Sequence, residues 1–156
     1  MTAPAPCSRR TFLERCVLAS ATGRVLPVLG ASALGGCASV ATRVLPMTNG
    51  QVHVRLREHP ELHEEHGVLR VTPEGSTDSF FVVRTSADVP IALSSVCTHL
   101  GCAVELVTGQ LVCPCHGSTY ALDGTVRRGP AVKPLPRYTA RLEPDDVLVI
   151  DLGKSA

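Results

Sequence analysis

Cysteines and histidines gather in two short segments near the middle of the chain. The first is Cys97-Thr98-His99-Leu100-Gly101-Cys102 and the second is Cys113-Pro114-Cys115-His116-Gly117-Ser118. Thiolate and imidazole groups are both good ligands for iron and for zinc. The two segments therefore predict a metal centre held between two loops.

Each segment offers one thiolate and one imidazole at close spacing, Cys97 with His99 and Cys113 with His116. Four such ligands suit a tetrahedral zinc ion. They also suit a 2Fe-2S cluster in which two histidines replace two cysteines on one iron. From these residue types, a 2Fe-2S cluster and a zinc ion both remain open.

The order and residue types of the two segments resemble the cluster-binding boxes of the Rieske family of iron–sulfur proteins. The resemblance extends through Gly129-Pro130-Ala131, which is similar to the family's proline-containing loop, and covers roughly residues 48–153. The 13 residues between His99 and Cys113 are somewhat few compared with the quinol-oxidising complexes, which indicates a trimmed hairpin. The resemblance implies one 2Fe-2S cluster, with Cys97 and Cys113 on the inner iron and His99 and His116 on the outer iron.

The resemblance also implies roles for the neighbours of these ligands. Cys102 and Cys115 are expected to form a disulfide that links the two loops. Ser118 and Tyr120 match hydroxyls that donate hydrogen bonds to cluster sulfur in high-potential members, which raises the potential. The other residues expected around the cluster are two glycines that permit tight turns, a leucine near the exposed tip and the loop proline: Gly101, Gly117, Leu100 and Pro130.

The N-terminus resembles a twin-arginine export signal at Ser8-Arg9-Arg10-Thr11-Phe12-Leu13. The apolar stretch Cys16–Gly36 that follows has Arg24 near its middle, which disfavours a membrane span. Leu34-Gly35-Gly36-Cys37 resembles a lipobox, so Cys37 is a candidate for lipidation, and a retained anchor is the alternative. We therefore expect export by the twin-arginine route to the periplasmic side of the cytoplasmic membrane, with residues 1–37 as signal and 38–47 as a tether.

From about Thr48 the hydrophobic pattern changes to a period of two, as in half-buried strands. The 12 prolines and 13 glycines indicate many turns and short strands. The sequence predicts an all-β domain over 48–153, an antiparallel sandwich or barrel with two cluster-binding loops. Its expected strands are 52–56, 68–71, 80–84, 91–94, 104–107, 110–112, 138–142 and 147–152.

Charge and composition narrow the function. After the first 36 residues, 11 basic and 13 acidic side chains remain without a basic stripe, so nucleic-acid binding has no support. The segment His59–His66, part of the histidine-rich stretch His53–His66, holds three histidines and three acids and fits either a solvated loop or an accessory metal site. The chain is too short to add the catalytic domain of a Rieske oxygenase.

The resemblance leaves three electron-transfer functions open. The first is the iron–sulfur subunit of a quinol–cytochrome c reductase-like complex, with a membrane cytochrome b-type subunit and a c-type cytochrome acceptor as partners. The second is the small subunit of an arsenite-oxidase-type molybdenum enzyme, whose partner is a molybdenum catalytic subunit. The third is an autonomous, membrane-tethered electron carrier. None of these makes the chain a complete enzyme alone.

Overall fold

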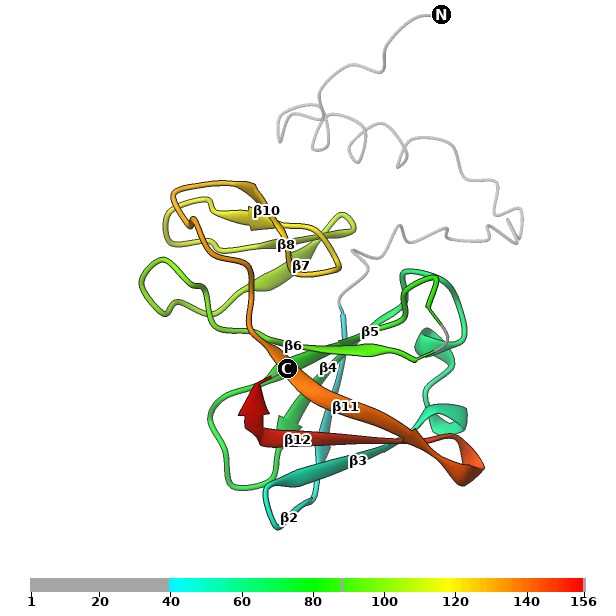
Figure 1. Ribbon diagram of the computed structural model, residues 1–156. Helices are drawn as coiled ribbons and strands as arrows, with labels where there is room; N and C mark the ends of the chain where they lie inside the picture. Colours follow the sequence, from blue (N-terminus) through cyan, green and yellow to red (C-terminus); the bar gives the residue numbers. More distant parts are fainter. Residues whose placement is uncertain (1–39, 88, 156) are drawn as a thin grey trace, which may run out of the picture. The chain divides into compact units, whose positions relative to one another are not determined.

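The computed structural model describes residues 40–87 and 89–155, which form twelve strands and no α-helix (Figure 1). Eight strands make a large sheet in the order β1-β4-β5-β6-β11-β12-β3-β2, and four make a small sheet in the order β10-β9-β8-β7. All pairs are antiparallel except β1 with β4. The strands are β1 (Ala41–Leu45), β2 (Met47–Thr48), β3 (Gln51–Arg55), β4 (Val68–Pro73), β5 (Phe80–Val83), β6 (Ile91–Ser94), β7 (Glu105–Val107), β8 (Gln110–Val112), β9 (Thr119–Tyr120), β10 (Val126–Arg128), β11 (Arg137–Glu143) and β12 (Val147–Ser155).

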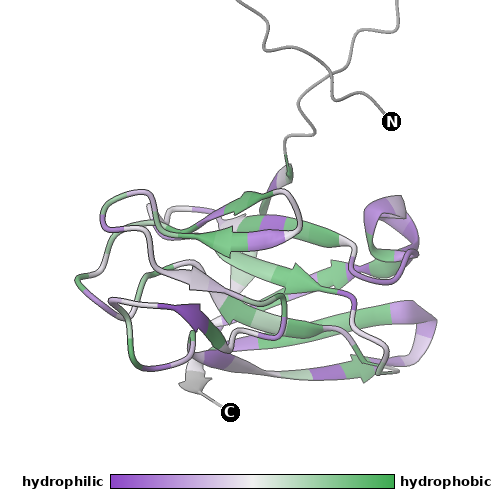
Figure 2. Cartoon of the chain, turned by 90° about the horizontal axis from the view of Figure 1, so that it is seen from above, coloured by the Kyte–Doolittle hydropathy of each residue, from purple (hydrophilic) through white to green (hydrophobic). Residues whose placement is uncertain are grey.

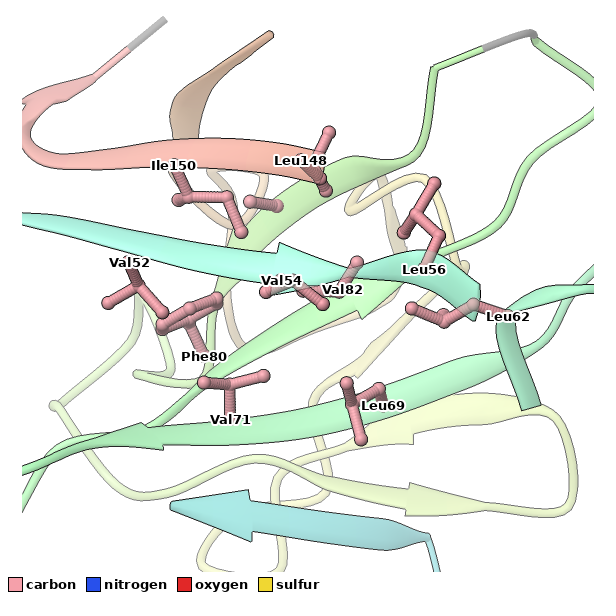
Figure 3. Packing of buried hydrophobic residues seen from close by; sticks show 11 residues of the cluster. Val52, Val54, Leu56, Leu62, Leu69, Val71, Phe80, Val82, Leu148 and Ile150 are labelled. Carbon is pink, nitrogen blue, oxygen red and sulfur yellow. The ribbon is translucent and has the colours of Figure 1, made fainter. Parts of the chain in front are cut away.

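The large sheet must curl until its two edges meet. Strands β1 and β2 lie at opposite edges of the sheet, yet only Pro46 separates them in the chain. One residue spans no more than a few ångströms. The curl encloses the first hydrophobic core, whose side chains point inward from β3, β4, β5 and β12 (Figure 3).

The second core lies on the other side of β5 and contains the cysteines of the candidate site. All four residues of β5 are buried. Phe80 and Val82 join the first core, whereas Phe81 and Val83 join the second. This alternation follows from the two-residue period of a strand. The second core also takes in Val104, Leu111, Cys97, Cys113 and Tyr120, so the large sheet provides the floor on which the cluster loops rest.

Hydrophobic residues follow the strands, and hydrophilic residues gather in the turns (Figure 2). The predicted strands are present, with small shifts at their ends: Leu56 belongs to a 3₁₀ turn, η2 (Leu56–Glu58), and Val104 precedes β7. The predicted hairpin is formed by β7 and β8 around Thr108 and Gly109, which both have positive φ.

The expectation of a tether over 38–47 is wrong for residues 41–47, which form β1 and the start of β2. The backbone of β1 pairs with β4 over five residues, while Thr42, Arg43 and Val44 stay exposed. An edge strand held by main-chain hydrogen bonds needs no alternating apolar side chains, so the sequence carried no signal for it. The short strands β9 and β10 were missed for a related reason, since each has only two or three residues.

The stretch considered for an accessory metal forms η2 and a second 3₁₀ turn, η3 (Pro60–Leu62). His59 is buried, with its Nδ1 3.6 Å from Oε1 of Glu61, and His63 Nε2 lies 3.1 Å from the Leu56 carbonyl. Among the described residues, the one set of three metal-binding side chains close together is a cysteine group elsewhere.

The described part of the chain contains no helix long and apolar enough to cross a membrane. The export signal, the lipobox and Cys37 lie outside the described residues.

Candidate metal centre

The two cysteine-containing loops have the same backbone hydrogen bonds. In each, the first cysteine donates its N–H to the carbonyl five residues later, and the glycine four residues later donates back to that cysteine. The bonds are Cys97 N–H to Cys102 O (2.8 Å), Gly101 N–H to Cys97 O (2.9 Å), Cys113 N–H to Ser118 O (2.8 Å) and Gly117 N–H to Cys113 O (3.0 Å). The two glycines have φ values of 78° and 75°, a region that side chains with a Cβ rarely adopt.

The two histidines face each other at the end of these loops. The ring centroids of His99 and His116 are 5.0 Å apart, with an interplanar angle of 89°. His116 is exposed, whereas His99 is half-buried. Nδ1 of His99 is buried and has no hydrogen-bond partner among the described residues. A buried imidazole nitrogen without a partner costs folding free energy. Coordination of a metal ion by this nitrogen would remove that cost.

The first cysteines of the two loops, Cys97 and Cys113, are more deeply buried than the histidines. Cys97 and Cys113 are both reduced and buried. Burial raises the pKa of the Cys113 thiol, and the neighbouring Cys97 raises it further. Burial also opposes ionisation of Cys97, but hydrogen bonds from Tyr120, the His99 backbone and other neighbours outweigh it, so the pKa of Cys97 lies below its ordinary value. Two adjacent buried thiols, one of them with a lowered pKa, suit a soft metal centre.

Cys102 and Cys115 form a disulfide that joins the two loops, which confirms the expected pairing. The Sγ atoms of Cys102, Cys113 and Cys115 all lie within 4.8 Å of one another, so the disulfide is close to one of the buried thiols. The cross-link holds the loops together without using Cys97 or Cys113, which remain available as ligands.

Tyr120, on β9, contacts two residues of the first loop. Its Oη lies 3.2 Å from Sγ of Cys97 and 3.1 Å from Oγ1 of Thr98, and it accepts a 3.2 Å hydrogen bond from the Thr98 N–H. The side chain is fully buried, and burial, followed by the hydrogen bond to Cys97, raises the pKa of its hydroxyl. The phenol therefore keeps its proton and can donate it toward sulfur.

Comparison with known proteins decides which kind of centre this is. Residues 52–139 match the model of the Rieske [2Fe-2S] domain. The chain belongs to the Rieske family. The site is accordingly that of a 2Fe-2S cluster, and the alternative of zinc falls away.

The relatives of this Rieske chain include iron-sulfur subunits of cytochrome b6-f complexes. It is 48% identical over 91 residues to the cytochrome b6-f complex iron-sulfur subunit of Chlorobaculum thiosulfatiphilum, covering 53% of this chain and 50% of the relative. It is 32% identical over 156 residues to the subunit of the same name from Synechococcus sp. (strain JA-3-3Ab), covering 91% and 86%. In the first two curated matches, the chain spans only about half of the relative's own length.

A solved structure shows the same fold. The quaternary ammonium Rieske monooxygenase CntA aligns with a TM-score of 0.51 at 17% identity, covering 62% of this chain and 31% of CntA. At this identity the likeness concerns the fold alone.

The proline-containing segment of the Rieske domain lies against both cluster loops. The Ala131 N–H donates a 3.0 Å hydrogen bond to Oγ of Ser118, which is fully buried in the second loop. The hydroxyl of Thr98, in the first loop, donates a 2.6 Å bond to the Lys133 carbonyl. These two bonds connect the segment to the two loops. The Gly129–Pro130 peptide bond that precedes them is cis.

The sequence analysis did not predict Thr98, Ala131 or Lys133 as site residues. Two of the three act through their backbone, for which the residue type gives no signal. Ser118 was expected as a donor to cluster sulfur. The structure shows its oxygen accepting from Ala131 N–H, which leaves its own proton free to be donated, and its hydroxyl is among the groups that lower the pKa of Cys97.

The tip of the Rieske domain is apolar and open to solvent. Leu100 in the first loop is 69% exposed, and Val132 in the proline-containing segment is 87% exposed. Leu100 follows His99 in the first loop, and Val132 lies between Ala131 and Lys133, which bond to the second and the first loop. Cys97 and Cys113 are therefore shielded by the fold, while His116 and Leu100 are exposed to solvent.

Proposed function

We propose that this chain is the iron–sulfur subunit of a quinol-oxidising, cytochrome b-type complex that passes electrons to a c-type cytochrome. The observation that carries the proposal is the position of Tyr120, whose hydroxyl lies 3.2 Å from the Cys97 sulfur in a loop pair closed by a disulfide. Hydrogen bonds to ligand sulfur raise a cluster's potential. A high potential is what oxidation of a quinol requires. The names of the relatives, cytochrome b6-f complex iron-sulfur subunits, support the same reading.

In this proposal Cys97, His99, Cys113 and His116 hold the cluster, which when bound takes up and releases one electron. The two thiols are buried, whereas His99 is half-buried and His116 is exposed, so the imidazoles are the ligands nearer to solvent. The buried Nδ1 of His99 gains the partner that it lacks in the protein alone. His116, which is exposed, is the group placed to exchange a hydrogen bond or a proton with a quinol.

The surrounding residues have supporting roles. Tyr120 and Ser118 donate hydrogen bonds toward sulfur, which favours the state with one more electron. The disulfide between Cys102 and Cys115 keeps the loops in register. Leu100 and Val132 offer an apolar surface for a lipophilic quinol.

The cellular location is part of the proposal. We infer export by the twin-arginine route and attachment on the periplasmic side, through a lipid on Cys37 or an uncleaved signal. The twin arginines Arg9 and Arg10 and the Leu34–Cys37 motif support it. A disulfide also persists more readily in an oxidising compartment. Mass spectrometry of the mature protein and of Cys37→Ala would test it: a soluble product that begins elsewhere would contradict both forms of attachment.

The electron-transfer function is tested by purifying the tagged full chain from its native membranes. We expect two irons and two sulfides per chain, a reduced-state electron paramagnetic resonance signal with a mean g below that of all-cysteine clusters, and co-purification of a cytochrome b. Purified complex should reduce cytochrome c with a quinol. Co-purification of a molybdenum subunit instead would favour the arsenite-oxidase-type role, and purification of the chain alone would favour an autonomous carrier.

A further inference from the structure

Basic residues are concentrated next to the cluster loops. Between Asp123 and Glu143 the sequence contains no acidic residue, yet it contains Arg127, Arg128, Lys133, Arg137 and Arg141. The hydrogen bonds from Ala131 to Ser118 and from Thr98 to Lys133 connect the middle of this stretch to both loops. These bonds place the backbone of Ala131 and Lys133, in the middle of the stretch, beside the two loops.

Two of these cations are not neutralised by the fold. Arg127 and Arg137 are close enough to Asp123 to lower its pKa, and Arg137 also donates to the Asp123 carbonyl. Arg128 and Lys133 are exposed, and within the described part of the chain neither has an ion pair or a side-chain hydrogen bond. Arg128 ends β10, and Lys133 follows the exposed Val132 in the segment that bonds to both loops.

Acidic residues collect at another end of the large sheet. Glu58 and Glu143 line one groove of about 550 Å³, where Glu58 pairs with Arg55 and Glu143 pairs with Arg141. Asp145 and Asp146 follow in the β11–β12 turn. Strand β11 leads from Arg137 to Glu143, which is about 20 Å at the usual rise of a strand. That distance exceeds the Debye length of about 8 Å at physiological salt. Charges at one end of β11 are therefore largely screened from charges at the other end.

We propose that the apolar tip at Leu100 and Val132, bordered by Arg128 and Lys133, is a docking surface for an acidic redox protein. The partner is an electron acceptor that presents carboxylates around the exposed edge of its own cofactor. The inference rests on the proposed electron-transfer function and adds the charge of the partner to it. An apolar contact brings the two redox groups together, while the charges steer the encounter and orient the histidine side toward the partner. An anionic lipid surface is the less favoured occupant, because it cannot accept the electron that leaves beside His116.

The first test measures the local charge with small oxidants. Reduced holoprotein is mixed with ferricyanide, an anion, or with tris(phenanthroline)cobalt(III), a cation, over a range of ionic strength. We expect ferricyanide oxidation to slow as salt rises and the cobalt reaction to quicken. Arg128→Glu/Lys133→Glu should lower the ferricyanide rate constant by about tenfold at low salt. The control Arg43→Glu/Arg57→Glu makes the same change in net charge on exposed residues of β1 and η2, and should have a much smaller effect.

The second test uses two c-type cytochromes of similar potential, one acidic and one basic around the haem edge. The acidic cytochrome should be reduced faster, and the advantage should disappear in Arg128→Glu/Lys133→Glu but not in the control. Equal rates for the two cytochromes, or equal effects of the two double variants, would overturn the inference. So would a result in which Arg128 and Lys133 govern binding to anionic lipid vesicles but not electron transfer.

These outcomes are separable from failure of the proposed function. The electron paramagnetic resonance signal and the thermal midpoint of each double variant establish that it is folded and carries its cluster. The cluster can be present and reducible while the two double variants have the same rate constants. In that case the docking surface is refuted and the proposed function stands. If no redox-active cluster is present in the wild-type protein, the proposed function itself fails.

Discussion

The guanidinium of Arg70 donates a 2.7 Å hydrogen bond to the backbone carbonyl of Val104. Arg70 lies on β4 of the large sheet, whereas Val104 lies between the first cluster loop and β7 of the small sheet. The same guanidinium lies over the ring of Phe81, 4.9 Å from its centroid. Arg70 thus connects the large sheet to the segment that carries the first loop.

Replacing Arg70 should therefore loosen the first loop. Arg70→Met leaves the carbonyl of the fully buried Val104 without this donor. A hydrogen bond from a charged group contributes about 1.5–3 kcal/mol, and this one is partly buried. Urea unfolding of the holoprotein should show the corresponding decrease and a shorter cluster lifetime, and Arg57→Met, on an exposed side chain, should not. An unchanged free energy of unfolding in Arg70→Met would show that the bond has no structural part.

The hydroxyl of Tyr120 is expected to raise the reduction potential, because it can donate to the Cys97 sulfur at 3.2 Å. Tyr120→Phe removes this donor and should lower the potential. A bond worth about 1.5 kcal/mol corresponds to about 65 mV for one electron. Protein-film voltammetry measures the shift. Tyr138→Phe is the matched control, because Tyr138 packs on Phe80 in the other core. The reduction potential of the cluster in this variant should equal the wild-type value.

The disulfide between Cys102 and Cys115 should stabilise both loops, since it closes a segment of 13 residues in sequence. Cys102→Ser/Cys115→Ser should lose about 2–4 kcal/mol of stability. The ligand residues remain, so the cluster should assemble but be lost sooner to a chelator. Iron release followed by absorbance measures this, and a lifetime equal to that of the wild type would contradict the structural role.

The turn that precedes β10 should be sensitive to acid. The hydroxyl and N–H of Thr125 donate to Oδ1 of Asp123, at 2.7 and 3.0 Å, and hold the pKa of the carboxyl below its ordinary value of 3.8. A lowered pKa stabilises the fold above that ordinary value, and the contribution is lost as pH falls through the folded-state pKa. Thr125→Val should therefore be less stable than wild type at neutral pH, with the difference shrinking below about pH 4. Urea midpoints across pH measure it; a difference that does not change with pH would exclude the carboxylate as its source.

Much of this protein was determined by short-range patterns in its sequence. Residues at fixed offsets, such as Cys97 and Gly101 or Cys113 and Gly117, make hydrogen bonds within their own loops, so each loop can be recognised from local residue types. The strands with alternating or continuous apolar residues were also predictable, because burial of one or both faces imposes that pattern. Both kinds of information reside within a few residues of the chain.

Other features were decided only by tertiary structure. The edge strand β1 is held by main-chain bonds to β4, which its exposed side chains do not reveal. The bond from Thr98 to the Lys133 carbonyl spans 35 positions, and the bond from Arg70 to the Val104 carbonyl spans 34. A backbone acceptor is available at every residue, so residue type cannot say which one is used. That choice follows from how the curled sheet and the small sheet bring distant segments together.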